Sequence, residues 1–308
     1  MLVSQTKKTP RPFIININKP AGITSYDIIR KWKPVLKSCG KVGHFGTLDP
    51  FADGVLMLGV AGAQRLNDYI HEYLPKTYLA KGVLGVETDT GDPDGEVTQK
   101  DEAPYLSEVI SKFEIPFIQE KLEAKFLGEY WQAPHKFSAA KFQGKPLHQW
   151  AREGVEIKKV DVRREVHSLE VVKYDFPNLW IRYQVSSGTY IRTLFRDCAI
   201  ELGTIGMLEG LTREKVGGSN LSNAMESEPS GDFLRLEIDE VLSFNSLYLN
   251  DEKSKLFLNG VQLRKDQLEG EGEKIFSKPF WVRQKSERII GLAEMKDDKL
   301  ISRINFPI

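Results

Sequence analysis

The sequence predicts a globular protein that mixes helices and strands, with one large domain followed by a small one. Three observations lead to this prediction. The chain has 308 residues, 41% of them hydrophobic and 28% charged, which suits two domains with sizeable cores. Strand-like and helix-like patterns of apolar residues both occur along the chain. Residues 216–232 (VGGSNLSNAMESEPSGD) have the composition of a linker, so we expect residues 1–243 and 244–308 to form separate domains.

The first predicted elements are a short buried strand over residues 13–17 (FIINI) and a helix that begins at Thr24. The run Thr-Ser-Tyr-Asp from Thr24 is typical of a helix start. Pro34 should kink or end this helix. Its apolar face is expected to consist of Ile28, Ile29, Trp32, Val35 and Leu36.

The remaining elements are predicted from the length and period of their apolar runs. Strands are expected over residues 55–60, 76–86, 157–174 and 178–186, and helices over residues 62–73 and 189–202. The last two of these strands should pair with each other. Residues 88–95 (TDTGDPDG) have the composition of a tight turn. The short strand-like stretches after residue 244 predict a small β-rich domain.

The composition and the two cysteines exclude several classes of protein. The apolar and charged fractions argue against a disordered, collagenous or membrane-spanning chain. No apolar run approaches the roughly 20 residues of a membrane helix, and the N-terminus lacks the apolar core of a signal peptide. Cys39 and Cys198 neither cluster nor have the spacing of metal ligands. We therefore expect no zinc site and a reducing compartment, the cytoplasm.

The net charge of zero conceals a strong segregation of charge along the chain. Residues 1–41 carry nine lysines and arginines against one acid, and residues 130–196 carry twelve against six. The segment between them holds seven basic and sixteen acidic residues. If the two basic segments fold together, they form a cationic face for a polyanion. Solvated surface charge explains them equally well.

The segment with the clearest chemical content is residues 43–56 (GHFGTLDPFADGVL), just before a predicted strand. Its glycines permit unusual backbone dihedral angles and close approach of a ligand. Asp49 precedes Pro50, which favours an extended conformation that presents the carboxylate. The segment therefore predicts a rigid loop that offers one carboxylate and the imidazole of His44. The alternative is a structural turn in which Asp49 bonds to its own backbone.

This segment resembles the catalytic-loop motif of the TruB family of tRNA pseudouridine synthases. Further stretches resemble that family in the same order over roughly residues 12–215. They are residues 18–25 (NKPAGITS), 76–78 (KTY) with 88–92 (TDTGD), 137–141 (FSAAK) with 144–147 (GKPL), and 187–194 (SGTYIRTL). The tail resembles the family's PUA-like RNA-binding domain more loosely. The resemblance implies an α+β fold, with a central mixed, largely antiparallel sheet and a small PUA-like β domain after it.

The activity that the resemblance implies is isomerisation of uridine 55 in the T-loop of tRNA to pseudouridine. The reaction breaks the bond from N1 to C1′, rotates the flipped uracil and joins C5 to C1′. It requires no redox step, phosphate donor or metal, and the sequence has no dinucleotide fingerprint, P-loop or metal-spaced ligand set. We therefore expect no cofactor and no metal. The expected partner is the T-arm stem-loop of tRNA, bound by a monomer without an obligate protein partner.

The resemblance also assigns roles to individual residues. Asp49 is implied as the nucleophile or as the stabiliser of positive charge at C1′, with addition to C6 of uracil as the other proposed course. Arg192 is implied as its ion-pair partner, and Tyr78 as the ring that stacks on uracil and is a candidate for proton transfer. The implied substrate-binding residues are His44, Tyr78, Tyr190, Leu211, Lys19 and Lys141. Taken singly, each of these would be interpreted as a structural or surface residue.

Some positions depart from the family pattern or permit another interpretation. Phe137 and His148 stand where tyrosine is usual in the family. The acids from Asp89 to Asp94 invite a calcium-loop interpretation, but Thr90 and Asp101 stand where that loop needs an acid and a glutamate. A hydrogen-bonded turn is therefore expected there.

Three alternative functions remain open at this point. A guide-RNA-dependent synthase has a related catalytic loop but acts within a multi-protein particle. A non-catalytic RNA-binding protein or RNA chaperone would bind tRNA without turnover. A nucleoside or sugar glycosidase would use Asp49 to release free uracil, although the sequence offers no clear second carboxylate for it.

Overall fold

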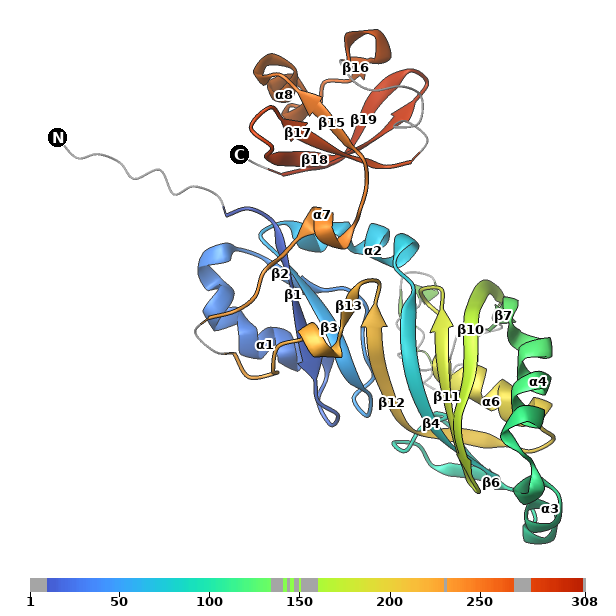
Figure 1. Ribbon diagram of the computed structural model, residues 1–308. Helices are drawn as coiled ribbons and strands as arrows, with labels where there is room; N and C mark the ends of the chain where they lie inside the picture. Colours follow the sequence, from blue (N-terminus) through green and yellow to red (C-terminus); the bar gives the residue numbers. More distant parts are fainter. Residues whose placement is uncertain are drawn as a thin grey trace.

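The structure, a computed structural model, describes residues 10–133, 141–142, 145–146, 150, 160–229, 232–268 and 278–306 (Figure 1). Within these residues the chain forms a large twisted sheet and, beyond it, a smaller C-terminal sheet. Phe137 and His148, where the sequence departs from the family pattern, lie outside the described residues.

The large sheet has ten strands among the described residues, and its main path runs β14-β1-β3-β12-β4-β11-β10-β7. Strand β13 pairs with β12, and β2 pairs with β3. Every pair of neighbours is antiparallel except β12 and β3, which are parallel at Thr212 and Asp53. The sheet is thus mixed and largely antiparallel, as predicted. Its strands are β1 (Phe13–Lys19), β2 (Val42–His44), β3 (Asp53–Val60), β4 (Lys76–Leu84), β7 (Gly128–Gln132), β10 (Val162–Asp175), β11 (Asn178–Val185), β12 (Gly206–Val216), β13 (Ser219–Asn220) and β14 (Leu236–Glu237).

Helices bury the apolar faces of this sheet at its two ends (Figure 1). Helix α1 (Ser25–Leu36) packs on β1 and β3 in one core cluster, and α4 (Ile115–Phe126) and α6 (Ile191–Glu201) pack on β4, β10, β11 and β12 in another. The shorter elements are α2 (Asn67–Tyr73), α3 (Ala103–Glu108), α7 (Ile238–Val241), β5 (Val86–Thr88), β6 (Val97–Lys100), β8 (Lys141–Phe142) and β9 (Lys145–Pro146), with 3-10 turns at Lys37–Cys39, Ala63–Leu66, Ile110–Lys112, Leu221–Asn223 and Lys265–Gln267.

The start of α1 is determined locally, as the sequence predicts. Thr24 accepts a hydrogen bond from the backbone of Asp27, and the Asp27 carboxylate accepts one from the backbone of Thr24. Pro34 lies inside the helix, which ends two residues later at Leu36. The loss of one backbone donor near the C-terminus is therefore tolerated, and the chain continues in a 3-10 turn.

The C-terminal sheet has the strand order β15-β17-β18-β19-β16. These strands are β15 (Ser246–Leu249), β16 (Leu263–Arg264), β17 (Phe280–Gln284), β18 (Ile289–Lys296) and β19 (Lys299–Asn305), with α8 (Asp251–Leu258) packed beside them. A shared apolar cluster joins this sheet to the large one, because Trp281 and Phe306 pack with Phe45 and Ile70. The C-terminal sheet therefore rests against α2 and the first half of the large sheet (Figure 1).

The segment that was expected to be a linker, residues 216–232, follows the edge of the large sheet over its described part. Val216 is still in β12, and Ser219 pairs back onto it after a turn at Gly217. Met225 exchanges backbone hydrogen bonds with Asn16 and Asn18 of β1. The composition indicated an irregular chain correctly, but the edge of β1 offers partners for its backbone groups, so the segment is bound to the sheet.

The strands of the two basic segments are not neighbours in the described part of the large sheet. The first segment contributes β1 and α1, and the second contributes β10, β11, part of β7 and the start of α6, which carries Arg192. Strands β3, β12 and β4 lie between these strands in the sheet order. The described strands of the basic segments therefore flank the middle of the sheet, because strand pairing, not charge, sets their positions.

Candidate active site

The loop that carries Asp49 connects β2 to β3 and is held in one shape by its neighbours. We call residues 45–52 the Asp49 loop. Ser25 exchanges two hydrogen bonds with Leu48, accepting from its backbone N–H at 2.9 Å and donating to its carbonyl at 3.2 Å. The backbone N–H of Ala52 donates to the carbonyl of Asp49 at 3.1 Å. Just after the loop, Gly54 has a φ of +107°, and a Cβ there would lie 2.4 Å from the carbonyl oxygen of Arg213. The predicted loop is present, and a glycine is required at position 54, just after it, by the close approach of β12.

Two buried cations, Lys19 and Arg213, donate hydrogen bonds to backbone carbonyls of the Asp49 loop. The Lys19 side chain is completely buried, and its ammonium donates to the carbonyls of Pro20 at 2.9 Å, Ile23 at 2.7 Å and Pro50 at 3.5 Å. Burial lowers the pKa of Lys19 to about 8. Lys19 thus contacts the loop, while its burial leaves a phosphate no access to the ammonium. Arg213, which the sequence did not single out, donates to the carbonyls of Val55 at 2.7 Å and Gly46 at 3.1 Å.

The structure brings Asp49 and Arg192 together although they are far apart in sequence. Nε of Arg192 lies 3.1 Å from Oδ2 of Asp49. The side chain of Asp49 is 37% exposed, whereas that of Arg192 is 6% exposed. Removal of the carboxyl from bulk water raises the pKa of Asp49; the Arg192 guanidinium opposes this rise, and Asp92 adds to it. Asp49 is consequently the reachable end of a buried ion pair, and its direction is set by the guanidinium.

Arg192 has a second carboxylate partner, Asp92. Nη1 of Arg192 lies 2.7 Å from Oδ2 of Asp92 and also donates to the carbonyl of Thr90 at 3.0 Å. The other oxygen of Asp92 accepts from the Thr90 hydroxyl at 2.5 Å and from the backbone N–H of Asp94 at 3.1 Å. Asp92 is therefore a buried, saturated acceptor that fixes Arg192 from behind.

The turn that carries Asp92 has the hydrogen-bonded form that was expected. The Thr88 hydroxyl donates to the carbonyl of Asp92 at 2.8 Å, and Gly91 has a φ of +71° next to Arg192. Sequence reasoning identified this segment as a turn but missed the role of Asp92 as a partner of Arg192. The available signal was its place in the stretch 88–92 that resembles the family motif. Among the described residues, no group of three or more His, Cys, Asp and Glu side chains is arranged to hold a metal ion.

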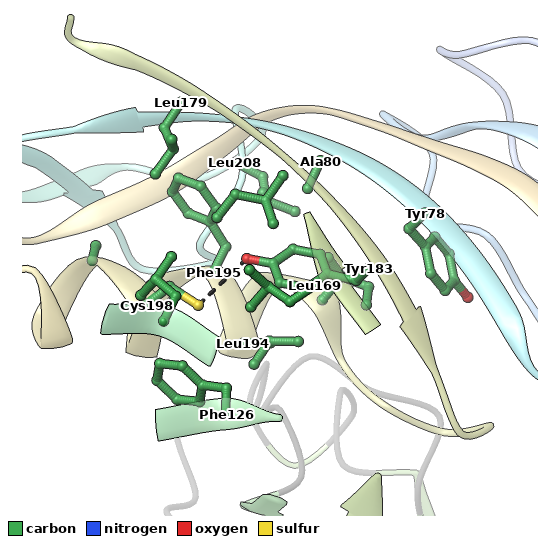
Figure 2. Close-up of a cluster of buried hydrophobic side chains, with 14 of the residues drawn as sticks. Tyr78, Ala80, Phe126, Leu169, Leu179, Tyr183, Leu194, Phe195, Cys198 and Leu208 are labelled. Atoms are coloured by element: carbon green, nitrogen blue, oxygen red, sulfur yellow. Dashed lines mark hydrogen bonds between the residues drawn. The ribbon is translucent and has the colours of Figure 1, made fainter. Parts of the chain in front are cut away.

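Tyr78 and Leu211 lie on the large sheet, near the Asp49 loop. They occupy neighbouring strands, since Tyr78 of β4 is opposite Arg213 and Leu211 of β12 is opposite Ala80. Both are almost buried, 8% and 7% exposed, and both belong to the same core cluster as Leu48. Figure 2 shows Tyr78 at the margin of this cluster, apart from the packed centre around Tyr183, Phe195 and Cys198.

The remaining predicted substrate-binding residues take different positions. Tyr190 lies directly before α6, where Gln132 accepts from its backbone N–H at 2.8 Å and donates to its carbonyl at 2.9 Å. His44 is half-buried at the end of β2, and its Nδ1 has no hydrogen-bond partner among the described residues. Burial and the nearby Arg213 lower the pKa of His44, which favours the neutral ring. Lys141 lies in β8, where only its backbone is described.

Known proteins can now be compared with this arrangement. The family model for "TruB family pseudouridylate synthase (N terminal domain)" matches residues 33–191. A tRNA pseudouridine synthase B from Clostridium kluyveri is 35% identical over 92% of this chain and 96% of its own length. The chain belongs to the TruB family of pseudouridylate synthases. The family resemblance and the enzyme class, an isomerase, are thereby confirmed.

Other relatives of this TruB-family chain have the same name. The tRNA pseudouridine synthase B of Dehalococcoides mccartyi is 34% identical over 83% of this chain and 85% of its own length. That of Francisella tularensis subsp. novicida is 33% identical, with 94% and 93% covered. Because these matches span both sheets, the likeness is not confined to the first domain.

Solved structures support the fold of the family member. A structure described as an H/ACA RNP bound to a substrate RNA containing 2′-deoxyuridine matches 96% of this chain and 85% of its own, with a TM-score of 0.62 and 16% identity. A Cbf5-Nop10-Gar1 complex has the same TM-score at 18% identity, with 96% and 84% covered. The α+β class, with a central mixed sheet and a C-terminal sheet domain, is confirmed. No helix in the described parts of the chain is long and apolar enough to span a membrane.

Proposed function

We propose that this chain isomerises uridine 55 in the T-loop of tRNA to pseudouridine, as a cytoplasmic monomer that acts on tRNA without a guide RNA. The relatives named tRNA pseudouridine synthase B, which match over most of the chain, support tRNA as the substrate. The observation that carries the proposal is the partly exposed Asp49 carboxylate held by Arg192, in a loop whose Leu48 packs in the same core cluster as Tyr78. This arrangement suits a reaction whose reacting centre is a sugar carbon with developing positive charge.

Addition to C6 of uracil is one proposed course; if the reaction instead takes place at C1′, the Asp49 carboxylate has two possible tasks. In one, it attacks C1′ as the N1–C1′ bond breaks, and the bonding electrons pass to the uracil ring. In the other, it stabilises the positive charge that develops at C1′ without forming a bond. In both, the uracil rotates and C5 bonds to C1′, which in the first course breaks the bond between Asp49 and C1′. The proton on C5 leaves to a base and N1 takes up a proton, so the net change is an isomerisation. Atoms balance without an external reagent, so we propose that the chain's own groups suffice.

Arg192 and Tyr78 have complementary tasks. Arg192 keeps the Asp49 carboxylate ionised and directed outward, while Asp92 keeps Arg192 from turning away. Tyr78 offers a ring for the flipped uracil and a hydroxyl for the proton step, with Leu211 as an apolar wall. We assign to His44 the task of stacking in the space that the flipped base leaves, since its lowered pKa favours a neutral ring.

A glycosidase requires a second acid or base that reaches the substrate. The carboxylate that the structure adds to the site, Asp92, is 6% exposed, and its oxygens accept from Arg192, Thr90 and Asp94. It is therefore not available to activate a water. This observation favours the synthase over the hydrolase.

The test is incubation of the purified protein with an unmodified tRNA transcript, followed by mapping of pseudouridine by position. The proposal expects conversion at position 55 without added protein or guide RNA. Conversion that needs a guide RNA, tRNA binding without conversion, or release of free uracil would each refute it. These outcomes correspond to the guide-dependent, RNA-binding and glycosidase alternatives in turn.

A further inference from the structure

A hollow of about 690 Å³ opens beside the Asp49 loop, and the proposed reaction does not use it. Helix α2, the end of β11 with the loop after it, and strand β10 form its walls. Among the described residues, it is lined by Asp68, His71, Glu72, Arg163, Arg164, Glu165, Ser186, Ser187 and Gly188. The hollow is next to the site because a Cβ at Gly46 of the Asp49 loop would lie 3.4 Å from Cε1 of His71, which lines the hollow.

A buried lysine lies behind the wall of this hollow. The side chain of Lys76 belongs to a residue that is 4% exposed, and its Nζ donates to Oγ of Ser187 at 2.7 Å. Nδ1 of His71 lies 2.5 Å from the same Oγ and 3.2 Å from Nζ of Lys76. Ser187 thus has the lysine on one side and the hollow on the other.

Lys76 has no carboxylate partner among the described residues, and the nearest strong charge to it is another cation. Burial and the neighbouring Arg213 lower the pKa of Lys76 to about 7. Burial also lowers the pKa of His71 to about 4, so this ring is neutral near pH 7. A buried charge without a counterion is costly. An anion in the hollow would supply the missing charge.

Arg164 adds a cation on the open side. It forms no ion pair with a described residue, and a Cβ at Gly188 would lie 3.0 Å from its Nη2. The guanidinium therefore occupies the space that a side chain at residue 188 would take, next to Ser187 in sequence. Only a residue without a side chain leaves it room there, since Gly188 also has a φ of +80°.

The position of Lys76 relates the hollow to the reacting nucleotide. Lys76 and Tyr78 point to the same face of β4, because buried and half-buried residues alternate along this strand. A Cβ at Gly46 of the Asp49 loop would lie 3.3 Å from Nζ of Lys76. When the target uridine of an RNA strand lies over Tyr78, a neighbouring phosphate of that RNA is therefore within reach of Ser187.

We propose that Ser187, Gly188 and Arg164, with Lys76 behind them, form a subsite for one backbone phosphate of the substrate RNA, adjacent to the flipped uridine. The inference rests on the proposed function, because it assigns the phosphate to the RNA strand that enters the active site. The phosphate oxygens accept from the Ser187 hydroxyl and from the Arg164 guanidinium. The acids that line the hollow, Asp68, Glu72 and Glu165, direct the anion to the Ser187 side.

The subsite predicts uptake of a proton when RNA binds. A phosphate next to Ser187 favours the charged form of Lys76, so its pKa rises on binding. Between about pH 6 and about pH 8.5, affinity should fall as pH rises, with a slope of log Kd against pH that approaches about one. The charged and titratable groups facing Lys76 or the hollow are Asp68, His71, Glu72, Arg163, Arg164, Glu165 and Arg213. Of these, His71 has its pKa far below the window.

The test measures binding of an unmodified tRNA transcript in an Asp49→Asn background, which prevents turnover. Lys76→Met should abolish the pH slope, weaken binding at about pH 6 about tenfold and reduce the salt slope by about one phosphate contact. Lys81→Met is the matched control, because Lys81 is on the same strand but pairs with Glu209 on the other face. It should leave the pH slope unchanged. Inorganic phosphate and uridine monophosphate, added in place of tRNA, should bind far more weakly if the RNA strand supplies the phosphate.

Arg164→Gln changes the open side without touching the buried lysine, and should weaken binding and reduce the salt slope while the pH slope remains. An unchanged pH slope in Lys76→Met, or unchanged affinity in both variants, would overturn the subsite. If the binding test fails in this way but the protein with Asp49 intact converts tRNA, only the subsite is refuted. If it converts no tRNA, the proposed function fails first.

Discussion

The buried cations near the two ends of the Asp49 loop differ in whether carboxylates of the chain neutralise them. At one end, Asp49 and Asp92 share Arg192, so the buried cation is more than compensated by carboxylates of the chain itself. At the other end, Gly46 lies over Lys76 and Arg213, which have only neutral acceptors among the described residues. The compensated end is ready for chemistry before the substrate arrives. The uncompensated end is completed only when an anion binds.

The largest effect on the rate of pseudouridine formation is expected from Arg192→Ala, which removes the cation that Asp49 and Asp92 share. The two carboxylates would then face each other without a cation between them, and Asp49 would be protonated more easily. Removing a preorganised charged group beside the reacting carboxylate should lower the rate of pseudouridine formation by about a hundredfold to a thousandfold. Initial rates with a tRNA transcript, together with circular dichroism to verify folding, test this prediction. A folded variant with near-normal rate would contradict it.

Asp92→Asn tests the same group of charges and should have a smaller effect on the rate. The variant retains a hydrogen-bond acceptor for Arg192 but loses the charge, which should lower the rate by about ten- to a hundredfold. Asp92 raises the pKa of Asp49, so its loss should lower that pKa. If the ionised carboxylate is the active form, the acid limb of the rate–pH profile should move to lower pH. A shift to higher pH would mean that Asp92 does not act on Asp49 through its charge.

Lys19→Met tests a buried lysine whose donors are satisfied. The carbonyls of Pro20, Ile23 and Pro50 would lose their partner, which should destabilise the fold by about 1–3 kcal/mol. Affinity for tRNA should change little, because this ammonium is inaccessible. Chemical denaturation measures the first effect and a binding titration the second. Weaker tRNA binding at unchanged stability would restore Lys19 as a phosphate contact.

Lys76→Met should change stability with the opposite sign. The folded protein holds the pKa of Lys76 near 7 against an ordinary value of 10.5, so the unfolded chain binds more protons between these values. The wild type therefore gains stability as pH rises through this range, relative to the variant. Lys76→Met should raise the melting temperature at about pH 6 and raise it less at about pH 9. A variant that is less stable at both pH values would show that Lys76 is a structural group.

Much of the fold could be predicted from the sequence because it depends on local patterns. The capped start of α1, the pairing of β10 with β11 and the helix after Tyr190 follow from spacing within a few residues. The segment 216–232 was less predictable, because its polar composition does not reveal that the edge of β1 is open to pair with Met225.

The site was predictable only where a motif marked it. The pairing of Asp49 with Arg192 was implied by family resemblance, and the structure brings these residues together. The pairing of Arg192 with Asp92 was missed, because an acid in a turn-rich segment is usually a surface residue. Lys76 lies in the stretch 76–78 that resembles the family, but nothing in that stretch indicates that its side chain is buried. Its burial follows from the register of β4 and from the loop packed above it, which are tertiary properties.

The most direct test of the central claim, that Asp49 is the reacting carboxylate of an RNA uridine isomerase, is tritium release from unmodified tRNA labelled at C5 of uracil. Pseudouridine formation replaces the C5–H bond by C5–C1′, so the label reaches water only if the reaction occurs. Wild type should release the label, and Asp49→Asn should release none while it still binds tRNA. Release by the variant at the wild-type rate, or no release by a folded wild type that binds tRNA, would contradict the claim.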